Sequence, residues 1–274
     1  MLKTLLKSAL AGLAAAVLLA PVADARSLDE IIKSGKIRIG AYPNGAPLSE
    51  VTPDGTWQGF DIDIGTKIAD MLGVEPVWVP QETPQRVPNL VSDRIDFSPG
   101  GLTRTPERMK VISYTVPLHT ESMAVLYTDK LEGKIGKIKS WRDLDREDVT
   151  IVNCRGCWPE EWRRNNMAKT KALLVDGVGD MVRSMSIGRA DAIVENLDFF
   201  MVHTENYPNV KWKVLPDIIQ TAYCGIGVKQ GNYALRDWLN AALYDLQTRD
   251  FHNETWGKHF GSPQVVPVVA QPYW

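Results

Sequence analysis

Residues 101–108, Gly-Leu-Thr-Arg-Thr-Pro-Glu-Arg, with a second glycine before them, decide more about this chain than any other stretch. They follow the apolar run of residues 95–98, which predicts a strand, and they lead into a short helix. Two glycines at a strand end let the backbone approach a ligand closely. Thr103 and Thr105 offer hydroxyl groups, and Arg108 offers a fork of donors that matches a carboxylate. The stretch therefore predicts a site for a small anion.

The first 25 residues have the pattern of a secretory signal peptide. Lys3 and Lys7 give a positive start, small and aliphatic residues follow, and residues 23–25 form an Ala-Asp-Ala cleavage site. The apolar run is shorter than the roughly 20 residues that span a bilayer, which disfavours the alternative of an uncleaved anchor. We therefore expect residues 1–25 to be removed and the mature protein to be periplasmic.

The composition indicates a soluble, exported protein of one large domain or two small ones. The full chain carries 31 basic and 33 acidic residues. This near-neutral balance gives no electrostatic reason to bind nucleic acid. The sequence has no Ser-His-acid set, phosphate loop or metal cluster, so we expect neither a metal nor a cofactor.

Strand and helix patterns alternate in two blocks, which predicts an α/β protein with parallel crossovers. The first block holds predicted strands at 36–40, 77–79 and 95–98 and helices at 61–72 and 84–93. The second holds strands at 149–152, 173–175 and 192–194 and helices at 159–168, 178–187 and 198–205. A strand at 225–228 and helices at 233–246 and 251–260 follow.

The segment after the second block is best explained by a discontinuous first lobe. We expect residues 26–124 plus 222–274 to form lobe 1 and residues 125–221 to form lobe 2. Two crossing segments would then form a hinge, and a ligand would bind in the cleft between the lobes.

Five motifs, in this order, resemble the periplasmic solute-binding proteins of family 3, which serve polar amino-acid uptake by ATP-driven transporters. They are Gly59-Phe60-Asp61-Ile62-Asp63-Ile64, Arg86-Val87-Pro88-Asn89-Leu90, the stretch 101–108, Gly188-Arg189-Ala190-Asp191-Ala192 and Gly225-Ile226-Gly227-Val228-Lys229. The resemblance implies a two-lobed type II binding-protein fold, a small carboxylate ligand, a membrane ABC permease as partner, and a monomer.

The resemblance also implies how the carboxylate is held. Arg108 matches the family's ligand-binding arginine, and Thr103 and backbone groups near Gly101 would assist it. In lobe 2 the turn that contains Cys157 and Trp158 precedes a predicted helix, whose free amides and dipole favour an anion. The two lobes would then close on one carboxylate.

The chain departs from the family at the other end of the ligand. Where amino-acid binders usually carry a carboxylate for the ammonium group, this chain has Asn196, preceded by Glu195. Either Glu195 turns into the cleft, or the ligand lacks an ordinary α-ammonium. Tyr42 is the candidate aromatic contact, with a packed loop residue as the alternative. Arg86 would reach a second carboxylate of an acidic ligand, or form a structural ion pair.

Cys154 and Cys157 form a C-x-x-C pair before a predicted helix. We expect a structural disulfide between them, because export favours oxidation. Redox chemistry and zinc binding are the alternatives: helix amides lower a thiol pKa, but neither a thioredoxin-like context nor a second ligand pair is present. Cys224, the third cysteine, would be buried.

These features favour a binding protein for a polar or acidic amino acid, with no enzymatic activity. Two alternatives remain. Periplasmic cyclohexadienyl dehydratases resemble this family, and Glu195 could then act as a general acid. A receptor whose closed form addresses a membrane sensor would have similar surface features.

Overall fold

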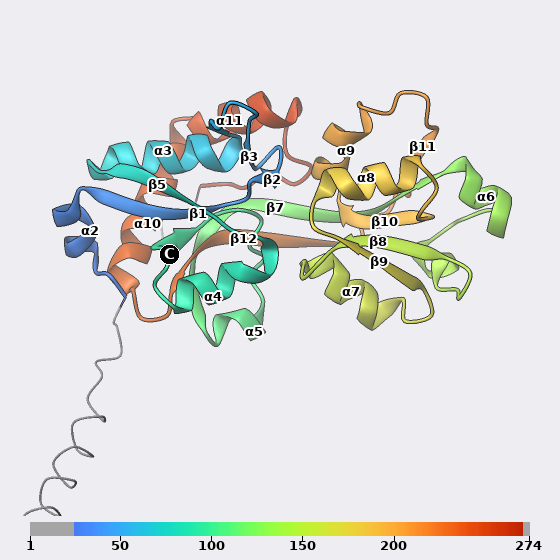
Figure 1. The fold of residues 1–274 in the computed structure, drawn as a ribbon, viewed down its shortest axis with the longest axis horizontal. Helices are drawn as coiled ribbons and strands as arrows, with labels where there is room; N and C mark the ends of the chain where they lie inside the picture. The colour runs from blue at the N-terminus through green and yellow to red at the C-terminus, as the bar shows by residue number, and fades with distance from the viewer. Residues whose placement is uncertain (1–24, 271–274) are drawn as a thin grey trace, which may run out of the picture.

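The structure is a computed structural model, and it describes residues 25–270. The predicted signal peptide and its alternative, a membrane anchor, fall almost wholly outside these residues. Within the described residues, a 9-stranded sheet has the order β5-β1-β6-β12-β7-β10-β8-β9, and β11 pairs with β7. Helices cover both faces of this sheet, and the molecule is elongated along the sheet (Figure 1). No helix between residues 25 and 270 is long and apolar enough to cross a membrane.

Lobe 1 is built on three parallel strands, β5 (Glu75–Pro80), β1 (Lys36–Ala41) and β6 (Phe97–Ser98). Its helices are α2 (Leu28–Ser34), α3 (Phe60–Leu72), α4 (Arg86–Val91), α5 (Pro106–Met109), α10 (Tyr233–Thr248) and α11 (Phe251–Phe260), with the 3-10 turn η1 (Thr83–Gln85) before α4. A small sheet of β2 (Asn44–Gly45), β3 (Ser49–Val51) and β4 (Trp57–Gln58) borders the cleft.

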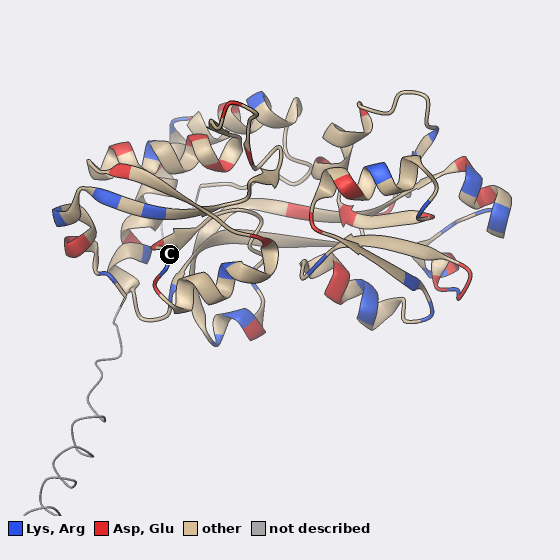
Figure 2. Ribbon diagram, in the orientation of Figure 1, with Lys and Arg blue, Asp and Glu red and all other residues tan. Residues whose placement is uncertain are grey.

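Lobe 2 is built on β10 (Ala192–Asn196), β8 (Thr150–Cys154) and β9 (Lys171–Val175), which run parallel to one another. Its helices are α6 (Asp129–Ile135), α7 (Trp158–Asn166), α8 (Val178–Ser186) and α9 (Leu197–Thr204), with the 3-10 turn η2 (Trp141–Leu144) and the short strand β11 (Trp212–Val214). Figure 2 shows both signs of charge mixed over the helices of the two lobes.

Two long antiparallel strands connect the lobes: β7 (Ile112–Thr128) and β12 (Gln220–Lys229). Their register pairs Met123 with Gln220 and Ile112 with Lys229, so the ladder runs from one lobe into the other. The predicted lobe boundaries, 124/125 and 221/222, fall within these strands. The exact boundaries stay a prediction, because a continuous strand has no break at which a lobe ends.

The hydrophobic residues form a main cluster in each lobe, and Phe199 of α9 in lobe 2 joins the cluster of lobe 1. The largest cluster lies in lobe 1 and includes Phe60, which meets Trp256 edge-on with ring centroids 5.2 Å apart. In lobe 2, one cluster lies on each face of the sheet, around Val125 and Val194 on one face and Leu126 and Ile193 on the other. This alternation follows from the period of two along a strand.

Most predicted elements are confirmed within a few residues. The capping box at Ser27 and Glu30 is formed, and Gly35 ends α2 in the left-handed conformation. The proline-interrupted helix predicted at 84–93 is the turn η1 followed by α4. The helix α6 lies in a segment for which the sequence analysis predicted no helix or strand. The sequence analysis missed the full length of β7 and the small sheet.

A buried carboxylate fixes β6 beside β1, just before the glycine turn of the predicted site. Asp96 accepts hydrogen bonds from Arg38 Nη2 at 2.6 Å and from the Arg38 amide at 2.7 Å. Arg26 adds an ion pair at 3.2 Å, and the Asp96 side chain is 1% exposed. The strand that carries the turn is therefore held by charge as well as by the sheet.

We predict that Asp96→Asn lowers the free energy of unfolding by about 2–3 kcal/mol, because it leaves two arginines and one amide without their anionic partner. Urea denaturation measures the loss. The control is Glu75→Gln, which removes the exposed Lys36–Glu75 pair and should cost about 0–1 kcal/mol. Equal losses in the two variants would contradict a special role for Asp96.

Candidate functional site

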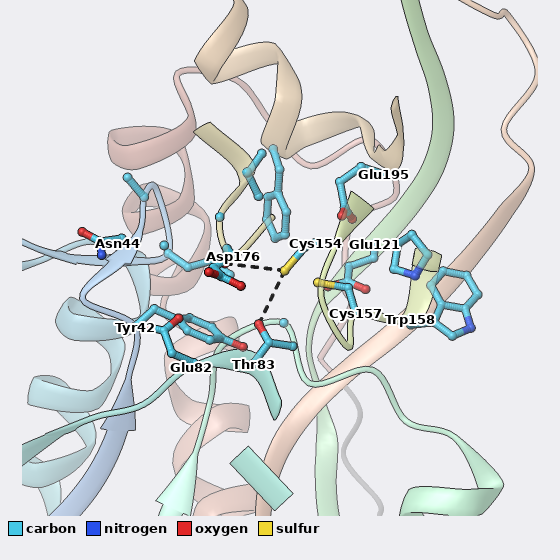
Figure 3. A pocket seen from close by; sticks show the side chains of 18 of the residues that line it. Tyr42, Asn44, Glu82, Thr83, Glu121, Cys154, Cys157, Trp158, Asp176 and Glu195 are labelled. Atoms are coloured by element: carbon cyan, nitrogen blue, oxygen red, sulfur yellow. Dashed lines mark hydrogen bonds between the residues drawn. The ribbon is translucent and has the colours of Figure 1, made fainter. Parts of the chain in front are cut away.

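A cavity of about 70 Å³ lies where the two lobes meet (Figure 3). Lobe 1 contributes residues of the small sheet, η1, α4 and the glycine turn; lobe 2 contributes the ends of β8, β9 and β10 and the starts of α7, α8 and α9. The lobes also touch directly, since His203 Nε2 lies 2.8 Å from the Ala46 carbonyl oxygen. The cavity has room for a few water molecules, so the lobes are closed on each other.

Arg86 forms the base of the lobe 1 wall. It is the first residue of α4 and is 3% exposed. Its Nη1 donates to the carbonyl oxygens of Gly100 and Gly101, at 2.7 and 2.9 Å, and its Nε donates to the Thr83 carbonyl at 3.2 Å. No hydrogen-bond partner is found for Nη2 among the described residues, so this nitrogen is free to bind a ligand.

The glycine turn presents its carbonyls to Arg86 because of its unusual backbone. Gly100 and Gly101 have φ angles of 70° and 55°, in the left-handed region that favours glycine. The aromatic ring of Tyr42 lies beside the same guanidinium, with the Arg86 Cζ 5.5 Å from the ring centroid. Burial raises the pKa of Tyr42, so its hydroxyl stays neutral.

Glu121 brings a carboxyl group into the cavity from the middle of β7. Its Oε2 accepts a hydrogen bond from the Thr103 hydroxyl at 3.0 Å, and a Cβ added at Gly101 would lie 2.9 Å from its Oε1. Burial raises the pKa of Glu121, against the opposing effects of the Thr103 hydrogen bond and the charge of Arg86. Glu121 as a whole residue is 5% exposed.

Glu195 faces the cavity from the end of β10 in lobe 2. Its Oε1 accepts from the Asn196 amide at 2.9 Å. Its Oε2 is buried without a hydrogen-bond partner among the described residues. Burial raises the pKa of Glu195 well above its usual value, and the nearby charge of Glu121 adds to the effect. An unpaired buried carboxylate oxygen is costly, which marks this atom as a candidate ligand contact.

The cysteine turn forms another part of the lobe 2 wall. Cys154 ends β8, Cys157 is the N-cap of α7, and both line the cavity with Trp158. The Cys154 Sγ lies 3.6 Å from the Thr83 hydroxyl of lobe 1, as Figure 3 shows. Cys154, Cys157 and Cys224 are all free thiols. No bond joins the Cys154 and Cys157 sulfur atoms in this structure, and the disulfide between them stays a prediction.

The structure brings most of the predicted binding residues to this cavity. These are Tyr42, Arg86, Gly101, Thr103, Cys157, Trp158 and Glu195. Asn196 and Arg108 are not among the lining residues. Asn196 caps α9, and its Oδ1 accepts from the Ser122 amide at 3.2 Å. Arg108 donates through Nη1 to the Thr103 carbonyl at 3.0 Å, so it supports the backbone that follows the glycine turn.

The lining includes three acidic residues, Glu82, Glu121 and Asp176, that the sequence analysis did not select. Of the described lining residues, the acidic ones are Glu82, Glu121, Asp176 and Glu195, and Arg86 is the basic one. A glutamate inside the run 112–128, which is mostly apolar or uncharged, is a signal that could have identified Glu121. No group of three or more His, Cys, Asp or Glu side chains within residues 25–270 is arranged to hold a metal ion.

We predict that Gly101→Ala destabilises the protein by about 1–3 kcal/mol, because a Cβ at a left-handed residue is strained and collides with the Glu121 carboxyl. Thermal unfolding measures the change. The control is Gly133→Ala in α6, where a Cβ meets no atom within 4 Å. That control should be neutral or stabilising by up to about 1 kcal/mol, and a neutral Gly101→Ala would contradict the described turn.

Comparison with known proteins shows which family and which relatives this chain is similar to. A model of the bacterial extracellular solute-binding proteins, family 3, matches residues 37–262. The L-cystine-binding protein TcyJ of Escherichia coli K12 is 26% identical over 246 residues, covering 88% of this chain and 90% of that protein. The cyclohexadienyl dehydratase of Pseudomonas aeruginosa is 25% identical over 167 residues, and this match spans 61% of each chain.

A solved structure confirms the fold. The ancestral amino acid-binding protein AncCDT-1, described as a precursor of cyclohexadienyl dehydratase, superposes with a TM-score of 0.77. It is 27% identical, and the match covers 85% of this chain and 99% of that one. The two-lobed type II binding-protein fold and the family resemblance are thus confirmed. The chain belongs to the bacterial extracellular solute-binding proteins, family 3.

Proposed function

We propose that this protein captures an amino acid between its two lobes and delivers it to an ABC transporter in the membrane. The observation that carries the proposal is the pairing of Arg86 with the unpartnered Glu195 oxygen. The two groups face one closed cavity from opposite lobes. A free α-amino acid carries a carboxylate and an ammonium group at one end, so it complements such a pair.

Arg86, rather than Arg108, is the residue that holds the carboxylate in this proposal. Its guanidinium is fixed by three backbone carbonyls, and its free Nη2 points to no other partner among the described residues. A preorganised arginine binds a carboxylate with charge-assisted hydrogen bonds. The amide of Trp158, in the first turn of α7, would add a second donor from lobe 2.

Glu195 holds the ammonium group in this proposal, with Glu121 nearby. An ammonium donor would satisfy the Oε2 atom that lacks a partner in the empty cavity. Burial is the main cause of the raised pKa of Glu195, and repulsion from Glu121 is the second. An ammonium group would also relieve this repulsion. Ligand binding would therefore make both carboxylates more stable as anions.

The lining charges narrow the class of ligand. An acidic amino acid or a dicarboxylate would bring further negative charge to a cavity whose acidic residues outnumber its one arginine. We therefore propose a neutral or cationic polar amino acid in place of the acidic ligand that the sequence analysis allowed. The cystine-binding relative supports an uncharged or zwitterionic ligand of this kind.

The remaining expectations rest on the family. Its members are extracellular by description, and we propose that this protein is periplasmic, monomeric and served by a permease. A membrane sensor is the alternative partner. Binding of the protein to vesicles that contain the permease, with and without ligand, would separate the two partners.

We predict that isothermal titration with a panel of free amino acids identifies a neutral or cationic ligand, while aspartate and glutamate show no binding. Arg86→Met should weaken the affinity about 100-fold and Glu195→Gln about 30-fold, because each change leaves one charged end of the ligand without its partner. Arg104→Met is the control, since Arg104 is exposed and lies outside the cavity. It should change the affinity by less than about twofold.

A panel in which glutamate binds and every neutral or cationic amino acid fails would contradict the proposed ligand class. Full affinity in Glu195→Gln would contradict the assignment of the ammonium contact.

We predict that affinity falls as the pH falls through the raised pKa of Glu195. Below that pKa the carboxyl group is protonated in the free protein and must lose its proton to pair with ammonium, whereas above it no proton is released. Titrations across the pH range measure this slope. In Glu195→Gln the slope should shrink to the part that Glu121 contributes, and an unchanged slope would show that another group is responsible.

An enzyme on this fold is a second candidate, favoured by the same Glu195. Its raised pKa keeps a proton available in a buried cavity, as general acid catalysis requires. The dehydratase relative and the ancestral precursor add to the case.

For the enzyme we predict turnover of prephenate or arogenate that is lost in Glu195→Gln and kept in Arg104→Met. Spectroscopic detection of the aromatic product measures it. Absence of turnover on both compounds, with amino-acid binding intact, leaves the binding protein alone.

A further inference from the structure

We propose that Cys154 and Cys157 form a reactive dithiol in the ligand cavity, which exchanges with a small disulfide ligand such as cystine. The proposal goes beyond amino-acid capture, because capture needs no thiol chemistry. It rests on the position of the pair, on the geometry of the turn between the two residues, and on the contacts of the sulfur atoms.

The turn that joins the two cysteines has the geometry of a closable dithiol. The Cys157 amide donates to the Cys154 carbonyl at 3.3 Å, and Gly156 between them has a φ angle of 71°. A hydrogen bond from the amide of the fourth residue to the carbonyl of the first, with a left-handed glycine in third place, is typical of a β-turn. The Cα atoms of the first and fourth residues of such a turn lie within about 7 Å of each other. A disulfide needs Cα atoms about 4.4–6.8 Å apart, so the pair can close with little backbone movement.

Both thiols face the site where the ligand would lie. They line the same cavity as Arg86 and Glu195, and Figure 3 shows both sulfur atoms among the cavity side chains. Cys154 is buried, so access to its sulfur atom runs through the cavity when the lobes separate. A small disulfide bound by its amino-acid ends would be presented to the thiols, while a large one would be excluded.

The surroundings of the two sulfur atoms make them unequal. A hydrogen bond with Cys157 lowers the pKa of Cys154, and the Thr83 hydroxyl and the positive charge of Arg86 act in the same direction. The bond with Cys154 and burial raise the pKa of Cys157. Since the thiolate is the nucleophile, Cys154 is the attacking residue and Cys157 the resolving one.

The exchange balances without a further reactant. The Cys154 thiolate attacks one sulfur of the ligand disulfide, which forms a mixed disulfide and releases the first ligand thiolate. Cys157 then loses its proton and attacks the Cys154 sulfur, which forms the Cys154–Cys157 disulfide and releases the second thiolate. The ligand is reduced by two electrons, the dithiol is oxidised by two, and the thiol protons pass to the released thiolates.

The test incubates the reduced protein with L-cystine and follows intact mass and released cysteine. We expect an internal disulfide and two cysteines released per protein. Cys157→Ser should stop at one cysteine attached to Cys154, and Cys154→Ser should react at least about tenfold more slowly. Cys224→Ala, which keeps the dithiol, should react like the unchanged protein.

Selectivity separates cavity chemistry from the reaction of any exposed thiol. Glutathione disulfide, which is larger, should react at least about tenfold more slowly than cystine, because the buried thiol of the attacking residue Cys154 is reached through the cavity. Equal rates with the two disulfides, or a dithiol that stays reduced in excess cystine, would overturn the proposal.

A double variant keeps this proposal distinct from the proposed function. Cys154→Ser combined with Cys157→Ser removes the thiols and is tested for amino-acid binding by titration. If it binds an amino acid while the unchanged protein fails to exchange with cystine, capture stands and the dithiol proposal falls. If exchange occurs but no amino acid binds, the dithiol stands and the proposed function falls.

Discussion

The buried guanidinium of Arg86 is the constraint on which the rest of the site depends. It is held by the carbonyl oxygens of Gly100, Gly101 and Thr83, and these hydrogen bonds fix the start of α4 against the end of β6. A buried cation needs such partners because desolvation is costly. The glycines supply them, since only their left-handed backbone turns both carbonyls toward one nitrogen. The same arrangement leaves Nη2 of the guanidinium free at the cavity.

The carboxyl groups opposite Arg86 follow from the way the lobes are joined. Glu121 lies in β7, one of the two strands that pass between the lobes, and Glu195 is the next-to-last residue of β10, which pairs with β7. The register places Glu195 beside Ala124, three residues from Glu121. The two carboxyls therefore meet near the hinge, where closure of the lobes removes water from both. Burial in this closed arrangement raises the pKa of both groups.

Much of this arrangement could be predicted from the sequence, because each motif has a local physical cause. The capping residues at Ser27 and Gly35, the helical spacing of Ile64 and Ile68, and the glycines of the 101–108 stretch each predict their own element. The ordered motifs then gave the family and the two-lobed fold. Tyr42, Thr103 and Glu195 were selected in this way, and all three line the cavity.

The features of the site that could not be predicted depend on contacts between segments far apart in the sequence, and no local sequence pattern encodes such contacts. Arg108 was expected to face the ligand, but its guanidinium binds the Thr103 carbonyl and Arg86 takes the cavity position. Glu121 lies in a strand whose length depends on pairing with β12, about 100 residues further on.

The central claim is that Arg86 and Glu195 hold the two charged ends of an amino acid. A crystal structure of the protein with its co-purified ligand, whose identity mass spectrometry establishes, tests it most directly. The account predicts the ligand carboxylate within hydrogen-bond distance of Arg86 Nη2 and the ammonium group within hydrogen-bond distance of Glu195 Oε2. A ligand whose carboxylate binds Arg108, with Glu195 Oε2 still without a partner, would contradict it.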